Sequence, residues 1–151
     1  MLTWDDEAAP VNLEEEVLLP PLLSLLRRYR WIGPKTKMRS EFPWNGRRVD
    51  FAYLSPTGIT SAFEMKLSSF QRVLEQAIYN RLSFDRSWIV VANIPRAENL
   101  DLAREYGIGV MVMQDQMRIL AMPTNQPRLN RTIRARLLSK LKNERSLPGV
   151  R

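Results

Sequence analysis

Two alternating segments joined by a short turn constrain the fold of this chain most strongly. Residues 48–54 and 59–67 both alternate apolar with polar or small side chains, and a period of two indicates strands whose faces differ. The tetrapeptide 55–58, Ser-Pro-Thr-Gly, lies between them. Proline presets the first position of a turn, and glycine accepts the left-handed conformation. We therefore predict a β-hairpin over this region.

The turn also predicts the register of the hairpin. A three-residue loop with glycine in the left-handed position is a common connection, and it sets Phe51 opposite Phe63. Asp50 then lies opposite Glu64. A shift by one residue would set apolar side chains against charged ones, and strand pairing resists such a shift.

This register has a chemical consequence. Directly opposed residues have Cβ atoms roughly 5 Å apart, and two carboxylates at that distance repel each other. A divalent cation would remove the conflict, because Mg²⁺ prefers oxygen ligands. Lys66 projects from the same face as Glu64, two residues away. Asp50, Glu64 and Lys66 are therefore candidates for metal-dependent phosphodiester hydrolysis. The alternative is a set of exposed strand residues with weak ion pairs.

The chain contains no cysteine and no histidine. Disulfides, thiolate metal sites and histidine-ligated zinc are therefore excluded, as are catalytic pairs that depend on histidine. Any metal must be held by oxygen ligands. A general base must be a carboxylate, a lysine, a tyrosine or a metal-bound water.

Charge is distributed unevenly along the 151 residues, a length that fits one domain. Residues 1–26 carry six acidic and no basic side chains, whereas residues 27–151 carry 23 basic and 10 acidic ones, a net charge of +13. A basic body indicates a polyanionic partner, most simply nucleic acid, with an anionic membrane surface as the weaker alternative. We divide the chain into an acidic leader (1–12), a central domain (13–122) and a basic C-terminal helix and tail (123–151).

The remaining pattern predicts an α/β domain whose mixed sheet is flanked by helices. Asn45-Gly46 is a hairpin signal, so the first three strands should form an antiparallel meander. Pro20 and Pro21 should kink or divide the first helix. The first helix is predicted over 13–30, and further helices over 68–83, 96–106 and 129–145. Further strands are predicted over 35–42, 87–92, 109–113 and 118–122.

The helix that follows the hairpin carries a polar flank. Arg72, Gln76, Tyr79 and Ser83 are spaced by four, three and four residues and share one side. Because this helix leaves directly from the strand with the candidate carboxylate and lysine, we expect it close to the metal. Gln76 would orient a water or a phosphate, and Arg72 and Tyr79 would hold the nucleic-acid backbone. The alternative is a solvated helix face.

Two other groups of basic residues could contact phosphates. Arg47 and Arg48 lie beside the first candidate carboxylate, and Arg131 and Arg134 belong to the crowded charges of the C-terminal helix. Phosphate neutralisation by that helix would make binding strongly dependent on salt. A solvated face is the alternative there as well.

Taken together, these residues resemble the PD-(D/E)XK nuclease superfamily, which has the restriction-endonuclease-like fold. The resemblance covers residues 13–113 and rests on Arg-Val-Asp50, a turn, Glu64-Met65-Lys66 and a helix bearing Gln76. It implies that Asp50 and Glu64 bind Mg²⁺, with Mn²⁺ as a substitute, and that Lys66 assists catalysis.

The family often adds a glutamate on its first helix, and Glu16 is the best match for this third metal ligand, with Glu41 as a second candidate. Two positions depart from the family pattern. Val49 stands where a proline often precedes the aspartate, and Tyr79 follows Gln76 by three residues rather than the four of RecB-like nucleases. The subfamily therefore stays open.

We expect a Mg²⁺-dependent endonuclease that acts on DNA. The alternatives are a non-catalytic nucleic-acid-binding module that retains the fold, and an interaction subunit that docks a partner through its leader or outer helices. Single-site nucleases often pair to cut both strands, which keeps a homodimer open. No signal peptide or spanning helix is visible, because the apolar stretch 17–26 is short and interrupted by prolines, and a cytoplasmic location is expected.

Overall fold

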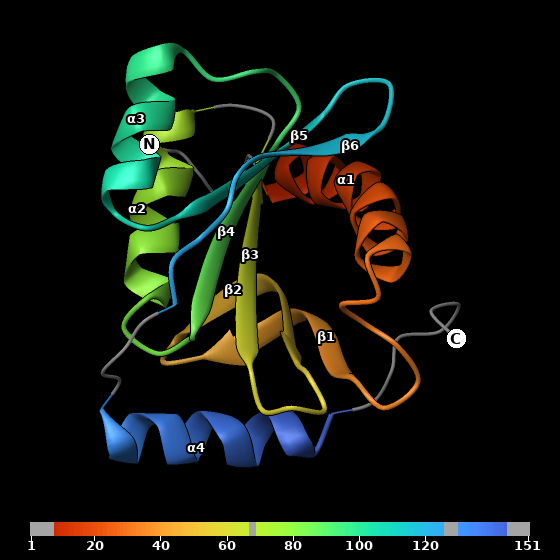
Figure 1. Cartoon of the computed structure of the whole chain (residues 1–151), viewed down its shortest axis with the longest axis vertical. Coiled ribbons are helices and arrows are strands. Elements are labelled where there is room, and N and C mark those ends of the chain that lie inside the picture. Colours follow the sequence, from red (N-terminus) through yellow and green to blue (C-terminus); the bar gives the residue numbers. More distant parts are fainter. Residues whose placement is uncertain (1–7, 67–68, 126–129, 145–151) are drawn as a thin grey trace.

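The computed structural model describes residues 8–66, 69–125 and 130–144, which form a six-stranded sheet with four helices around it (Figure 1). This confirms the predicted α/β class with a mixed sheet. The elements in chain order are α1 (Ala8–Arg28), β1 (Lys37–Trp44), β2 (Arg47–Leu54), β3 (Thr60–Lys66), α2 (Phe70–Asn80), β4 (Arg86–Val91), α3 (Ala97–Glu105), β5 (Gly109–Met113), β6 (Met117–Ala121) and α4 (Arg131–Lys142).

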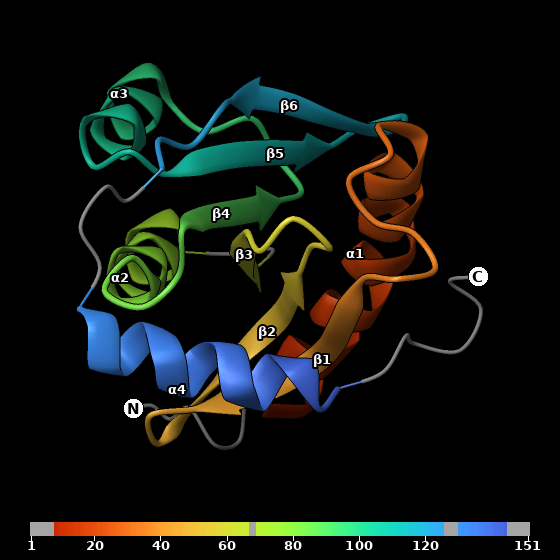
Figure 2. The same ribbon diagram turned by 60° about the horizontal axis from the view of Figure 1, so that its bottom comes forward.

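The strands lie in the sheet in the same order as in the chain, from β1 to β6. The first three form the predicted antiparallel meander. β3, β4 and β5 run parallel, and β6 returns antiparallel to β5 (Figure 2). Because the parallel connections pass through α2 and α3, these two helices lie beside each other on one face of the sheet.

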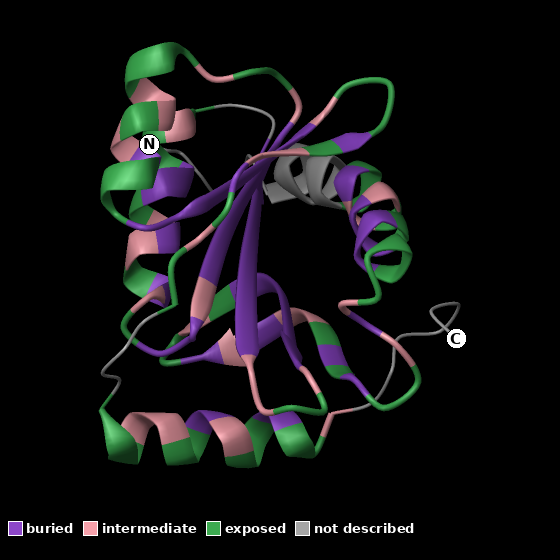
Figure 3. Ribbon diagram, viewed as in Figure 1, coloured by how far each residue is buried: buried purple, intermediate pink, exposed green. Residues whose placement is uncertain are grey.

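Three apolar clusters hold the helices in place. The leucines of α1 pack with Phe51, Phe63 and Met65 on one face of the sheet. α2 and α3 pack on the other face, over β4 and β5. α4 lies across β1 and β2, where Leu137 and Leu141 are buried in a third cluster (Figure 3). The predicted basic C-terminal segment therefore contributes to the core through the described part of its helix.

Helix α1 differs from its prediction in two ways. It begins at Ala8, so part of the predicted leader is helical, and it runs through Pro20 and Pro21 without dividing into two helices. Each proline removes a backbone hydrogen bond. Buried leucines on both sides of the pair, among them Leu18 and Leu22, pack on the sheet, and such packing is what stabilises most helices in proteins.

Both predicted turns are present. Asn45 and Gly46 have φ of 52° and 76°, as a two-residue hairpin turn between β1 and β2 requires. Gly58 has φ of 93°, and the Ser55 amide donates to the Ile59 carbonyl at 2.9 Å. The loop between β2 and β3 is therefore the one that the sequence predicts.

The helix after the hairpin is shorter than expected. α2 begins at Phe70, and Ser69 at its N-cap has a left-handed backbone and makes no side-chain capping bond. Ser68, where the predicted helix begins, lies outside the described residues. In the described part of the chain, no helix combines the length and apolarity needed to cross a membrane.

Candidate active site

The register of β2 and β3 agrees with the prediction as far as Phe51 and Phe63, where the pairing ends. The expected backbone pair between Asp50 and Glu64 is absent from the described ladder, and this expectation is corrected. Instead, Oδ2 of Asp50 accepts a hydrogen bond from the amide of Met65 at 2.7 Å. The side chain of Asp50 thus connects the two strands at the point where their backbones separate.

An irregularity in β1 lies at the same level of the sheet. The β1–β2 pairing runs regularly on both sides of Glu41 but does not include it, and Glu41 has a positive φ of 51°. In this register Glu41 would face Asp50. The backbone around the candidate aspartate is therefore irregular toward both neighbouring strands, which leaves its carboxylate to satisfy a backbone donor of β3.

The three candidate catalytic side chains are all buried. The relative exposure is 9% for Asp50, 1% for Glu64 and 7% for Lys66, and β3 is buried along its whole length (Figure 3). This excludes the alternative of exposed strand residues with screened ion pairs. Burying a charge costs several kcal/mol per ion unless partners compensate. Such clusters of buried charge are typical of functional sites.

The carboxylate and the lysine of β3 face the helix that carries the predicted polar flank. Glu64 is the parallel partner of Ile89, and Lys66 is the partner of Val91. Both β4 residues belong to the apolar cluster under α2 and α3. The leucines of α1 pack against the opposite face of the sheet.

Sequence reasoning missed one residue of this site, Asn80 at the end of α2. Its side chain is buried, and Nδ2 donates to Oε2 of Glu64 at 2.9 Å. Its Oδ1 accepts from Nη1 of Arg47 at 3.2 Å. The guanidinium of Arg47 also lies 4.4 Å from the centre of the Tyr79 ring. A chain of contacts thus leads from the protein surface to the buried carboxylate.

The signal for Asn80 was present in the sequence. It follows Gln76 by four residues, so both project from neighbouring turns of one helix flank. Oε1 of Gln76 is buried and has no hydrogen-bond partner among the described residues. An unpaired buried acceptor is costly, and native proteins contain few of them. A donor or a cation that enters the site from outside the protein would satisfy it.

The predicted nucleic-acid contacts are distributed unequally. Arg47 and Tyr79 lie at the site, in contact with each other, and Tyr79 is exposed. Arg48 is exposed and pairs with Glu41 at 2.6 Å. Arg72 is exposed on α2, and Arg131 is exposed at the start of α4.

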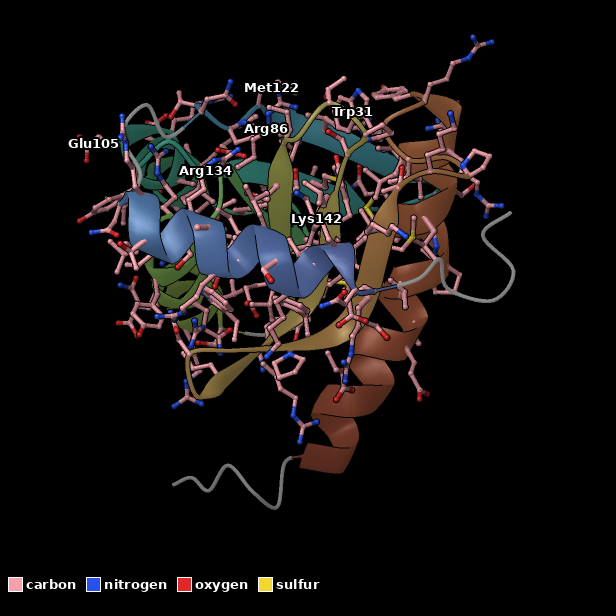
Figure 4. All side chains as sticks on the ribbon, turned by 90° about the horizontal axis from the view of Figure 1, so that it is seen from below. Trp31, Arg86, Glu105, Met122, Arg134 and Lys142 are labelled. Atoms are coloured by element: carbon pink, nitrogen blue, oxygen red, sulfur yellow. The ribbon has the colours of Figure 1, made fainter. Side chains whose placement is uncertain are left out.

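Arg134 makes contacts within the protein that the sequence did not predict. Its Nη1 lies 2.7 Å from Oδ1 of buried Asp85, and its Nη2 donates to the carbonyl of Gly58 at 2.9 Å. These contacts fasten α4 to the β2–β3 hairpin; Figure 4 labels Arg134 on the helix. The guanidinium of Arg134 is thus engaged with the protein, and its contact with nucleic acid stays a prediction.

The predicted auxiliary acids do not join the carboxylate pair. Glu16 is exposed on α1, whose buried side packs on the opposite face of the sheet from Glu64. Glu41 is paired with Arg48. In the described residues no group of three acidic side chains is arranged to hold a metal. The expectation of a third protein carboxylate from Glu16 is thus corrected.

The donor set that remains fits a divalent cation. Asp50 and Glu64 supply carboxylate oxygens, and Gln76 supplies a neutral oxygen in need of a partner. Mg²⁺ keeps several waters and commonly uses only one or two protein carboxylates together with substrate phosphates. Two carboxylates on adjacent strands are therefore a sufficient protein contribution.

A pocket opens next to the lysine. It has a volume of about 220 Å³ and is lined by Lys66, Ser69 and Phe70 on one side and by Val91 and residues 93–96 on the other. It lies beyond the carboxyl ends of the parallel strands β3 and β4, where ligands bind in open α/β sheets. A phosphate with part of its sugar could approach Lys66 through this opening.

No protein-family model matches the chain, and no curated protein sequence matches it. Among solved structures, it is similar to SPO1766, a protein of unknown function from Silicibacter pomeroyi, with 25% identity and a TM-score of 0.60 over 82% of this chain and 80% of that one. The two chains therefore share a fold over most of their lengths.

Two other solved structures are more distant. An EndoMS complex with double-stranded DNA is 16% identical, with a TM-score of 0.48 over 68% of this chain and 46% of that one. Pyrococcus furiosus SfsA in complex with Ca²⁺ is 16% identical, with a TM-score of 0.38 over 73% of this chain and 61% of that one. Neither similarity is strong enough to bear on the function.

Proposed function

We propose that this protein is a Mg²⁺-dependent nuclease that hydrolyses phosphodiester bonds in DNA. One observation carries the proposal. Two carboxylates and a lysine, all at least nine-tenths buried, lie on adjacent strands where the strand pairing ends, and a pocket opens beside the lysine. The resemblance to the PD-(D/E)XK superfamily implies a core of one helix, three antiparallel strands, a second helix and a further parallel strand, and α1 to β4 have this order and these strand directions.

The residues have distinct roles in this proposal. A cation held by Asp50 and Glu64 would supply an activated water and neutralise charge on the phosphate. The ammonium of Lys66 binds a phosphate oxygen in the adjoining pocket and stabilises the negative charge that develops there. Oε1 of Gln76 accepts a hydrogen bond from the attacking water and orients it. Asn80 holds the carboxylate of Glu64 in position.

The charge of the body supports a nucleic-acid substrate, but α4 contributes less than its composition suggests. Arg136 lies over the Trp44 ring at 5.1 Å and donates to Asn45, and Lys140 lies 5.6 Å from the centre of the Phe42 ring. These cations help to dock the helix on β1. Half-buried Arg47, beside exposed Arg48 and Tyr79, is the better candidate for phosphate contact.

The test is cleavage of plasmid, single-stranded and branched DNA, with matched RNA substrates, in Mg²⁺ or Mn²⁺. We expect Asp50→Asn and Lys66→Ala to lose at least about 10²–10³-fold in rate. Asp101→Asn and Lys142→Ala change exposed residues of the same types and should cleave like the unmodified protein.

Equal cleavage by all variants would identify a contaminant and overturn the proposal. Binding of nucleic acid that falls steeply with salt, without metal-dependent cleavage of any substrate, would instead favour the alternative of a non-catalytic binding module.

A further inference from the structure

Two neighbouring cavities lie at the opposite end of the hairpin from the lysine. Their volumes are about 450 and 390 Å³, and both are lined by Arg30, Trp31 and Pro56. These volumes fall in the range of small-molecule sites. Along β3, Lys66 lies about 20 Å beyond Thr60, the strand residue nearest this end. The cavities are therefore separate from the candidate active site.

The walls of the cavities combine flat aromatic surface with positive charge. Trp31 and Tyr53 supply aromatic rings, and Arg30, Lys35 and Arg86 supply cations. No acidic side chain is among the described residues that line them. In Figure 4, Trp31 and Arg86 are both labelled above α4. A ligand that matches this lining carries an aromatic ring and a negative charge.

The indole of Trp31 is already held in place. Its ring lies 5.3 Å from that of Tyr29 and 5.8 Å from that of buried Trp88, measured between ring centres. Trp31 itself is half-buried, so part of the ring faces the cavities. A fixed, partly exposed aromatic ring is the stacking platform that nucleic-acid bases use.

Arg30 has a backbone conformation that favours glycine. Its φ is 62°, and it ends α1 in a Schellman motif, in which the Trp31 amide donates to the Leu26 carbonyl and the Arg30 amide to the Arg27 carbonyl. Glycine is the usual residue at this position because it avoids steric strain. A strained residue is often retained for its function, and here the exposed side chain of Arg30 lines both cavities.

We infer that the paired cavities bind a nucleotide unit. Its base stacks on the indole of Trp31, and its phosphate pairs with Arg30 and one of the neighbouring cations. The unit is either a free mononucleotide or the terminal nucleotide of a strand, since both present the same ring and charge. The inference rests on the cavities alone and not on the nuclease activity proposed above.

The experiment is a calorimetric titration in EDTA with dAMP and with a short single-stranded oligonucleotide that carries a 5′ phosphate. Adenosine and ribose 5-phosphate separate the contributions of base and phosphate. We expect both parts to be needed for tight binding. Competition between the two main ligands assigns the site to strand ends, and binding of dAMP alone assigns it to free nucleotides.

Arg30→Gly separates binding from folding. Glycine relieves the backbone strain, so the melting temperature should stay the same or rise, whereas nucleotide affinity should fall by about tenfold or more with the loss of a charged contact. Asn45→Gly is the matched control, because Asn45 also has a positive φ, of 52°, and lies in the turn between β1 and β2, away from the cavities. It should bind like the unmodified protein.

Trp31→Leu should remove the preference for nucleotide over ribose 5-phosphate. Asp101→Asn, an exposed residue of α3 outside both sites, should bind nucleotide normally. The inference is overturned if neither dAMP nor the oligonucleotide binds at millimolar concentration, or if Arg30→Gly binds as tightly as the unmodified protein.

Discussion

The two ends of β3 each carry a cluster of buried polar side chains, and the clusters differ in how their hydrogen bonds are satisfied. At the first end, the amide and the hydroxyl of Thr60 both donate to Oδ2 of Asp85, at 2.8 and 3.1 Å, and the amide of Asp85 donates to the Thr60 hydroxyl at 2.9 Å. Nη1 of Arg134 donates to Oδ1 of the same carboxylate at 2.7 Å. All the partners that this cluster uses belong to the protein. It has the properties of a structural cluster, which fastens the hairpin, β4 and α4 together.

The second end holds Asp50, Glu64 and Lys66 with equal burial but a different surrounding. On α2, one turn before Asn80, Oε1 of Gln76 is buried without a partner in the described part of the chain, and a pocket leads to the lysine. Burial of charge therefore does not by itself identify a functional site in this protein. A buried lysine beside an opening distinguishes the second cluster from the first, because Thr60 and Asp85 are bonded to each other and Asp85 to Arg134, and each prediction below tests that distinction.

The largest effect on stability should come from the first cluster. Asp85→Ala leaves the guanidinium of Arg134 half-buried without its carboxylate and removes the acceptor of the Thr60 amide. Breaking such a pair should lower the free energy of unfolding by about 3–5 kcal/mol. Chemical denaturation measures this change. Nuclease activity at a temperature where the variant is folded should be retained; a loss of activity with the fold intact would mean that the two ends are not independent.

A smaller effect is expected at Asn80, which positions Glu64. Asn80→Ala should lower the rate of metal-dependent cleavage by about 10–100-fold and raise the Mg²⁺ concentration needed for half-maximal rate. The second readout is specific, because a merely structural role would not change the metal requirement. Thermal unfolding without metal serves as the control for folding, and a variant with normal metal dependence would remove Asn80 from the site.

Gln76 tests the importance of the unsatisfied acceptor directly. Gln76→Leu removes a buried oxygen without a described partner, so the metal-free protein should be equally stable or up to about 1 kcal/mol more stable. Cleavage should fall by about tenfold, the equivalent of one hydrogen bond. Glu75→Leu, on the exposed side of the same helix, is the matched control. Lower stability with unchanged cleavage would show that Gln76 is structural.

The smallest effect is a change of stability with pH, and it concerns Tyr53, which pairs with Ser61 near the first end of β3. Burial raises the pKa of the Tyr53 hydroxyl above its usual value of 10.0. The folded protein therefore keeps this proton at a pH where the unfolded chain has lost it, and stability should fall as pH rises above about 10. The difference in unfolding free energy between the unmodified protein and Tyr53→Phe, followed from pH 8 to 11.5, isolates this contribution. A constant difference would contradict the prediction.

The sequence predicted what depends on local pattern. Alternation and turn chemistry were sufficient for the hairpin and its register up to Phe51 and Phe63, because both act within about twenty residues. The end of the pairing at Asp50 was not predictable in this way. The end of the pairing coincides with a left-handed backbone at Glu41, and glutamate does not usually adopt this conformation.

Residues whose roles depend on distant partners were harder to predict. Arg134 lies in a basic helix, which predicts phosphate binding, but its partner Asp85 lies 49 positions earlier in the chain and could not be identified from local pattern. Asn80 contacts Glu64, 16 positions earlier in the chain, because α2 packs back against β3. Periodicity placed Gln76 on the flank of α2 that also carries Asn80, but which residue of a flank reaches Glu64 depends on how the helix packs.

The order of the strands has a consequence for how this protein assembles. Every strand pairs with the next one in the chain, from β1 to β6, so no pairing waits for a segment synthesised much later. Short separations between partners favour rapid folding, even though two of the connections are parallel crossovers. The sheet can grow in one direction as the polypeptide emerges from the ribosome, and the charged groups of β3 are covered only when α2 docks.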